Sequence, residues 1–169
     1  MQVHSIDLRD YQRRLLDRIR STEESGAASS HLGFEVGEQR WAVPLTEVSE
    51  VLRVPPVVAV PGTQDWFLGV ANVRGSLYAI SDFALFVSGI ATNITPESRL
   101  VLLSERYRIG AALLIRRSLG LCMMREVAEA NGLAQSWTSV MHRDAEGRIW
   151  NELSVQRLAR DPRFLRVAL

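Results

Sequence analysis

The stretch "GVANVRGSLYAISDF", residues 69–83, places two apolar runs on either side of an Arg-Gly corner. This pattern predicts two strands joined in a hairpin, with Gly75 at the corner, where glycine allows a positive φ or a close backbone approach. Asn72 and Arg74 are unexpected beside segments that predict buried strands. Unpaired burial of an arginine would cost several kcal/mol. We therefore expect Arg74 to pair with Glu50, which lies in the preceding segment "EVSEVL".

Short apolar segments bounded by turn residues also fill most of the chain outside the hairpin. Their spacing of roughly 8–12 residues is typical of small β-barrels or a sandwich. Two segments, "EQRWAVPL" from Glu38 and "ERYRIGAALL" from Glu105, resemble each other and suggest two similar β-subdomains. We expect a short helix or turn in "REVAEANGL", an irregular or helical "TEVSEVL" capped by Thr46, and a closing helix "SVQRLARDPRFL" capped by Ser154.

The N-terminal region differs in pattern from the rest. Residues 1–20 form a predicted amphipathic helix, and residues 21–30, "STEESGAASS", read as a flexible linker to a domain over residues 31–169. The helix carries a single apolar stripe at helical spacing, made of Leu8, Tyr11, Leu15 and Ile19. We expect this stripe to dock on the chain's own β-domain near the second barrel. The alternative is that it binds a partner.

Composition excludes several classes of function. The net charge of +1 is too small to steer the chain towards nucleic acid or membranes, and there is no lysine for a Schiff base or a phosphate loop. Cys122 is the only cysteine, so no internal disulfide is possible. The histidines His4, His31 and His142 lie in separate contexts without metal-ligand spacing. We therefore predict no catalysis, no cofactor and no metal. Charge interrupts the N-terminal segment "IDLRDYQRRLLDRIR" throughout, unlike a signal peptide, and no apolar stretch approaches the roughly 20 residues needed to cross a bilayer. Both features favour a cytoplasmic protein.

Three segments in order, "FEVGEQRWAVPLTEVSEVL", a Pro-rich stretch ending in "VPG", and "FLGVANVRGSLYAISDF", resemble the CheW family of chemotaxis coupling proteins. The resemblance is clear over residues 32–87 and continues more loosely to residue 159. Within it, "NVRG" resembles the family's Asn-Leu-Arg-Gly signature. The wording "GVANVRG" and the ending "RIWNELSVQRLARDPRFL" look most similar to PilI-type members, which serve type IV pilus and twitching systems. Ala79 departs from the pattern, because the family usually has a proline there.

The resemblance implies a mainly β fold with two five-stranded SH3-like barrels and a groove between them. It also implies a non-catalytic adaptor that joins the cytoplasmic tip of a transmembrane chemoreceptor to the regulatory domain of a CheA-type histidine kinase, within membrane receptor arrays. Carried over by position, the partner-binding residues would be Leu45, Val48, Glu50, Gly69, Asn72, Arg74, Gly75 and Asp82. A purely structural role for Arg74 and Glu50 stays open, as does a core role for Val48. Alternative functions are flagellar chemotaxis coupling and a small nucleic-acid-binding barrel.

Overall fold

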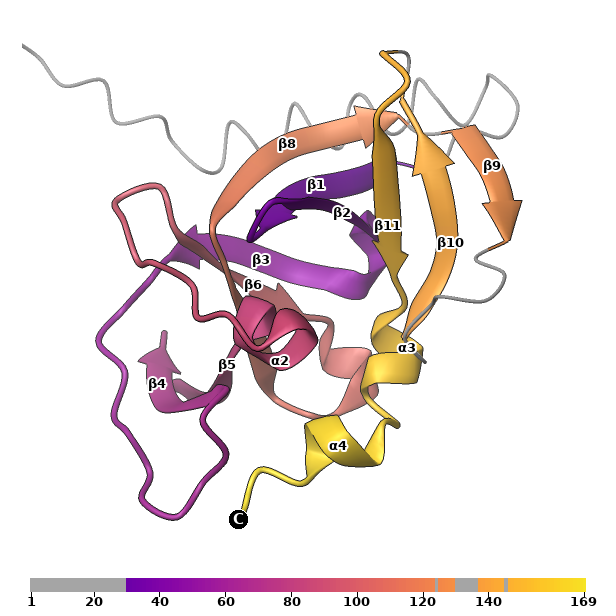
Figure 1. Ribbon diagram of the computed structural model, residues 1–169. Coiled ribbons are helices and arrows are strands. Elements are labelled where there is room, and N and C mark those ends of the chain that lie inside the picture. The colour runs from indigo at the N-terminus through magenta and orange to yellow at the C-terminus, as the bar shows by residue number, and fades with distance from the viewer. Residues whose placement is uncertain (1–29, 124, 130–136, 145) are drawn as a thin grey trace, which may run out of the picture.

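The computed structural model describes residues 30–123, 125–129, 137–144 and 146–169 (Figure 1). The predicted N-terminal helix and almost all of the linker lie outside the described residues. The described elements are β1 (Ser30–Val36), β2 (Gln39–Pro44), η1 (Leu45–Glu47), β3 (Val48–Arg53), β4 (Phe67–Val73), β5 (Ser76–Asp82), α2 (Phe83–Ser88), β6 (Arg99–Leu103), η2 (Glu105–Tyr107), β7 (Ala111–Ile115), β8 (Arg117–Met123), β9 (Arg125–Glu129), β10 (Thr138–Arg143), β11 (Ile149–Leu153), α3 (Val155–Leu158) and α4 (Pro162–Leu165).

The strands form two sheets, and one of them is built from the two ends of the described chain. The first sheet has six strands in the order β8-β1-β2-β11-β10-β9 and is strongly curled in Figure 1. The second has five strands in the order β3-β6-β7-β5-β4. Because β3 to β7 are consecutive in the chain, the second sheet is an insertion between β2 and β8. The predicted mainly β class and two-part architecture are confirmed, with β9 as a sixth strand in the first sheet.

The sequence echo falls on strands with equivalent places in the two sheets. In the first sheet, β2 lies between antiparallel β1 and parallel β11. In the second, β7 lies between antiparallel β6 and parallel β5. The segments beginning at Glu38 and Glu105 contain β2 and β7, so the echo marks the same topological position in two related halves.

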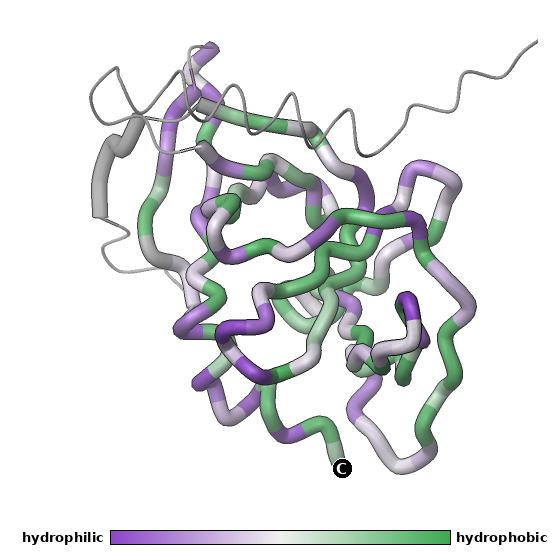
Figure 2. The backbone as a smooth tube through the Cα atoms, turned by 180° about the vertical axis from the view of Figure 1, so that it is seen from behind, coloured by the Kyte–Doolittle hydropathy of each residue, from purple (hydrophilic) through white to green (hydrophobic). Residues whose placement is uncertain are grey.

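A single large core joins the two sheets. Alternate residues of β6 and β7 face opposite sides, because successive side chains of a strand point to opposite faces. Val101 and Leu113 pack with Phe34 and Trp41 of the first sheet in the shared core, while the other faces of these strands line a separate core inside the second sheet. Burial on both faces explains the unbroken apolar runs "LVLL" and "AALLI". Figure 2 shows hydrophobic stretches of the backbone gathered in the middle of the molecule.

Three local predictions need correction. The segment after Arg125 is strand β9, not a helix or turn, because it pairs with β10. Thr46 caps nothing, since the short helix η1 follows Pro44 and the chain continues as β3. The closing helix is two short helices. The side chain of Ser154 caps the first as predicted, and Pro162 begins the second. Among the described residues, no helix is both long and apolar enough to cross a membrane.

Candidate functional site

The Arg-Gly corner is a tight hairpin turn with positive φ at both central residues. Arg74 has a φ of 52° and Gly75 a φ of 90°, which is the combination that a type I′ hairpin requires and that matches the natural twist of paired strands. Asn72 supports the turn, because its Oδ1 accepts a hydrogen bond of 2.8 Å from the Gly75 backbone N–H. Asn72 and Gly75 thus build the turn, and they hold the Arg74 side chain at the tip of the hairpin.

The predicted ion pair between Arg74 and Glu50 is present and bidentate. The two guanidinium nitrogens of Arg74 donate to the two carboxylate oxygens of Glu50 at 2.9 and 2.7 Å. Glu50 lies on β3 and Arg74 on the β4–β5 turn, and β3 and β4 are the two edge strands of the five-stranded sheet. The ion pair therefore links edge strand β3 to the turn at the end of the other edge strand, β4. The Glu50 side chain is only 13% exposed, whereas that of Arg74 is 73% exposed, so the partial burial that the pairing argument assumed holds for the carboxylate alone.

Gly69 is required by a close approach of two backbones. The Pro-rich segment bridges to β4 through two hydrogen bonds between Val58 and Val70, of 2.8 and 2.9 Å. A Cβ on Gly69 would lie 2.0 Å from the Val58 carbonyl oxygen, and Gly69 itself has a φ of 129°. A side chain at this position would push the Pro-rich segment away from the sheet. The role of Gly69 in the structure is thus to hold this segment against the edge strand.

Asp82 is buried and serves as a structural anchor. Its Oδ1 accepts hydrogen bonds from the backbone N–H groups of Ala84 and Leu85, which caps the start of α2. The same carboxylate accepts from the backbone N–H and the hydroxyl of Thr92, both at 2.7 Å. The side chain therefore ties the long loop after α2 to the end of β5. With its hydrogen-bonding capacity directed into the fold, Asp82 does not present a contact surface for a partner.

Leu45 and Val48 lie where the chain crosses from the first sheet to the second. Leu45 is in η1 and Val48 begins β3, and both are half-buried and pack against the shared core. The structure therefore favours the core role that was left open for Val48. Both residues keep some exposure, so a partner could contact their edges but not their whole side chains.

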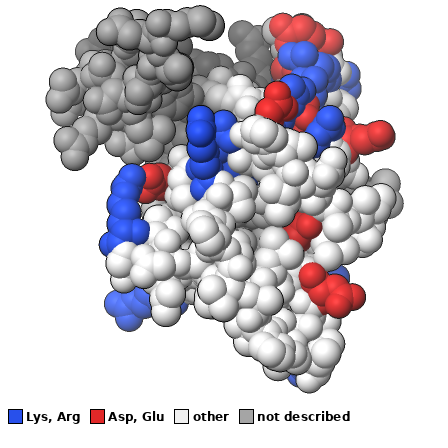
Figure 3. All heavy atoms as spheres, turned by 90° about the vertical axis from the view of Figure 1, so that its left-hand side faces the viewer, with Lys and Arg blue, Asp and Glu red and all other residues white. Residues whose placement is uncertain are grey.

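Exposed apolar side chains surround the hairpin. Leu77 pairs with Asn72 across β4 and β5 and is 69% exposed, and Val58 on the neighbouring Pro-rich segment is 67% exposed. We call the set Glu50, Val58, Asn72, Arg74 and Leu77 the hairpin surface. Figure 3 views the molecule from the left-hand side of Figure 1, where β4 and the Pro-rich segment lie, and shows a broad uncharged area with charged groups towards its margins. Exposed apolar groups in such an area are typical of protein–protein contact.

Comparisons with known proteins identify the family. A model of the CheW-like domain matches residues 30–163. The chain belongs to the CheW-like family. Among its relatives is the protein PilI of Pseudomonas aeruginosa, 33% identical over 118 residues, which cover 69% of this chain and 65% of PilI. FrzA of Myxococcus xanthus is 36% identical over 67 residues, 40% of this chain and 42% of FrzA.

One further relative and one solved structure bear the CheW name. The chemotaxis protein CheW of Helicobacter pylori is 23% identical over 88 residues, 52% of this chain and 53% of that protein. The crystal structure of the scaffolding protein TtCheW from Thermoanaerobacter tengcongensis shares the fold, with a TM-score of 0.62, 13% identity and coverage of 75% of this chain and 89% of that one. The matches in the curated relatives PilI, FrzA and CheW each span less than two thirds of the relative's length.

The CheW-like chain also has a polar junction that the sequence analysis missed. Glu47 accepts hydrogen bonds from the Tyr107 hydroxyl and from the backbone N–H of Val155, each at 2.7 Å. It thereby joins η1, η2 and the start of α3 beside an open hollow that Arg106 and Arg160 also line. Burial and the nearby carboxylate together raise the pKa of Tyr107 above its ordinary value. No local pattern in the sequence indicates this junction, because Glu47 lies 60 positions from Tyr107 and 108 from Val155.

Proposed function

We propose that this chain is a non-catalytic adaptor that couples a transmembrane chemoreceptor to a CheA-type histidine kinase in a chemosensory pathway. The proposal rests on the CheW-like match over residues 30–163. The hairpin surface supports it, because the ion pair between Arg74 and Glu50 holds this surface in a defined arrangement. The match to TtCheW, a scaffolding protein, supports a role in assembly rather than in chemistry. In this role the protein would work in the cytoplasm at membrane receptor arrays.

The pathway that we propose is the control of type IV pilus twitching. The match to PilI is longer and higher in identity than the match to the Helicobacter pylori CheW. The flagellar alternative is favoured by the Helicobacter pylori relative, which is named as a chemotaxis protein CheW. A pilus-type receptor and a large histidine kinase encoded beside this chain would support the first, and a flagellar gene set would support the second.

The hairpin surface is the proposed contact for the receptor tip. Leu77 and Val58 offer apolar area, while Arg74 and Asn72 supply a polar rim, which is the usual composition of a protein–protein interface. Transient signalling contacts are often small, below about 1,200 Å² of buried surface, so the few exposed groups of the hairpin surface are enough. Gly69 and Asp82 would support this surface from within, and Leu45 and Val48 would contribute their exposed edges.

The test is binding of the purified full chain to the cytoplasmic fragment of its receptor and to the regulatory domain of its kinase. Leu77→Asp places a charge in the hairpin surface at an exposed position, so the variant should fold and lose receptor binding. Ile149→Asp is the matched control, because Ile149 is 45% exposed but lies on β11 of the other sheet. If both variants bind the receptor as well as the wild type does, the hairpin surface is not part of the interface. If the wild type binds neither partner, the adaptor proposal is contradicted.

A further inference from the structure

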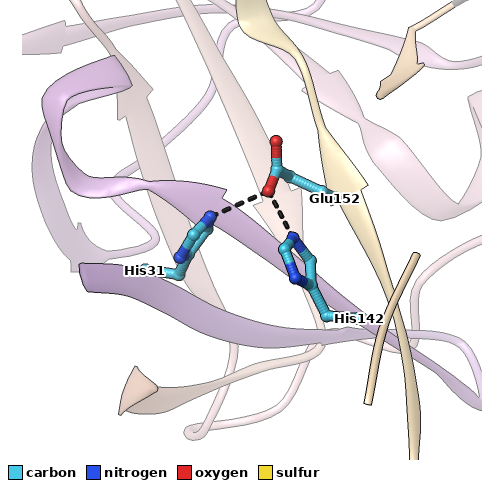
Figure 4. Close-up of side chains that lie close together, drawn as sticks. All are labelled: His31, His142 and Glu152. Carbon is cyan, nitrogen blue, oxygen red and sulfur yellow. Dashed lines mark hydrogen bonds and ion pairs between the residues drawn. The ribbon is translucent and has the colours of Figure 1, made fainter. Parts of the chain in front are cut away.

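Two histidines and a glutamate from distant parts of the chain meet inside the first sheet. Figure 4 shows His31 of β1 and His142 of β10 both pointing at Glu152 of β11. The Nε2 atoms of His31 and His142 lie 2.9 and 2.5 Å from the same carboxylate oxygen, Oε2 of Glu152. The side chains of the two histidines are 2% and 5% exposed, and that of Glu152 is 16% exposed. These three groups form a compact, largely buried cluster.

Strand alternation places this cluster in the interior of the six-stranded sheet. On β1, Leu32 and Phe34 face the shared core, so His31 and Gly33 face the other way. A Cβ on Gly33 would meet the side chains of Cys122 and Trp150, which pack together inside this sheet. The equivalent interior of the second sheet is lined by aliphatic residues such as Ile80, Leu100 and Leu114. The first sheet thus holds imidazoles and a carboxylate where its related half holds hydrocarbon.

We propose that His31, His142 and Glu152 form a binding site for a divalent transition-metal ion, with Zn²⁺ as the ion that fits best. Two imidazole nitrogens and one carboxylate oxygen are ligands that zinc accepts in proteins. Imidazole ligands disfavour Mg²⁺ and Ca²⁺, which prefer oxygen. The site is separate from the hairpin surface, which lies on the other sheet, and it does not depend on the adaptor function.

The geometry needs only a small adjustment to hold the ion. The three ligand atoms all lie within 4.8 Å of one another. Zinc bonds of about 2.0–2.1 Å in tetrahedral geometry set ligand atoms about 3.3 Å apart. The two nitrogens, at 2.9 and 2.5 Å from the oxygen, would move away from it by less than about 1 Å. Any pair of ligand atoms now as far apart as 4.8 Å would close by about 1.5 Å, and side-chain rotation can supply both movements. Without metal, the same groups are held together by the two hydrogen bonds, so the site is arranged before the ion arrives.

A bound metal ion would join strands β1, β10 and β11, which are far apart in the sequence and meet only in the folded chain. Residue 31 comes before the inserted sheet, and residues 142 and 152 come after it. An ion that binds the folded state but not the unfolded chain stabilises the fold by mass action. The proposed role of the metal is therefore structural. It would link β1, the first described strand, to β10 and β11, the last two.

The experiment is a titration of the metal-stripped full chain with Zn²⁺ alone, in competition with a chromogenic chelator. We expect one Zn²⁺ per chain, a higher melting temperature with Zn²⁺, and no such response to Mg²⁺. His142→Gln, His31→Gln and Glu152→Gln should each weaken binding by at least about tenfold, the loss that removal of even an outer-shell partner causes. His4→Gln and Cys122→Ser are the controls, because they remove the other histidine and the only thiol of the chain. Both controls should bind Zn²⁺ like the wild type.

A second readout keeps the test decisive if a cluster variant fails to fold. X-ray absorption at the zinc edge of the wild-type complex should show two imidazole nitrogens and a carboxylate oxygen, with no sulfur. The proposal is overturned if the wild type does not bind Zn²⁺ at micromolar concentration. It is also overturned if folded cluster variants bind as tightly as the wild type, if His4→Gln or Cys122→Ser abolishes binding, or if the absorption spectrum contains sulfur.

Discussion

Replacing Arg74 with alanine should destabilise the protein measurably, because it removes the bidentate link between edge strand β3 and the turn at the end of β4. The arginine side chain is mostly in water, so its own desolvation cost is small. Glu50 is different: it is 13% exposed and loses both of its charged hydrogen bonds. The cost of the substitution is therefore mainly the cost of leaving a nearly buried carboxylate without this partner.

The size of the effect lies between two known limits. Exposed ion pairs contribute less than about 1 kcal/mol, and breaking a fully buried pair costs about 3–5 kcal/mol. One exposed and one nearly buried partner place Arg74→Ala at about 1–2 kcal/mol. A loss of 1 kcal/mol lowers the melting temperature of a domain of this size by about 2–4 °C. Arg74→Gly should be milder by roughly 1 kcal/mol, because glycine adopts the positive φ of 52° without strain.

The assay is urea unfolding of the wild type, Arg74→Ala, Arg74→Gly, Glu50→Ala and the Arg74/Glu50 double alanine variant. The double-mutant cycle isolates the pairwise term, which should be about 1 kcal/mol. A coupling energy of zero, or Arg74→Ala as stable as the wild type, would refute the view that this ion pair stabilises the sheet. Arg74→Gly less stable than Arg74→Ala would refute the assigned turn strain.

Substitutions at three further positions test other parts of the structure. Gly69→Ala should cost roughly 3 kcal/mol or more by urea unfolding, because its Cβ would collide with the Val58 carbonyl; a loss below 1 kcal/mol would contradict the close approach. Asp82→Ala should cost about 2–3 kcal/mol, because buried N–H groups lose their acceptor, and Asp82→Asn should cost less. The hydrogen bond from Arg117 lowers the pKa of Glu35 below its ordinary 4.5. Glu35 therefore adds stability above pH 4.5 that is lost as the pH falls through its lowered pKa, and Glu35→Gln should flatten this acid loss in melting curves recorded from pH 7 to pH 3.

The hairpin and its ion pair could be predicted from the sequence because they rest on local chemistry. An Arg-Gly corner between apolar runs predicts a turn. An arginine beside buried strands predicts a carboxylate partner, because unpaired burial of its charge is costly. Glu50 lies in the segment that precedes the hairpin, and a compact barrel would place that segment beside the Arg-Gly corner. The exposure of Arg74 could not be predicted, because it depends on where the two sheet edges stop. The hydrogen bonds from Thr92 to Asp82 were also missed, since Thr92 lies in a loop that shows no pattern of its own.

Long-range topology explains the larger misses. Strand β9 contains Ala and Glu, which favour helix, and only its pairing with β10 makes it a strand. His31 and His142 appeared isolated because 110 residues lie between them in the sequence. The six-stranded sheet contains both of their strands and brings them together with Glu152, although the second sheet is inserted between them in the chain. No local spacing encodes that meeting. The expectation that the histidines lie in separate contexts was wrong for these two.

Reconstitution of the kinase, the receptor fragment and this chain tests the adaptor proposal most directly. The measurement is kinase autophosphorylation with the receptor fragment held in a membrane-mimetic array, with and without the chain. We expect the receptor to control the kinase only when the chain is present, and the Leu77→Asp variant to fail while Ile149→Asp succeeds. Receptor control of the kinase without the chain, or no control with it although both partners are active, would contradict the proposed function.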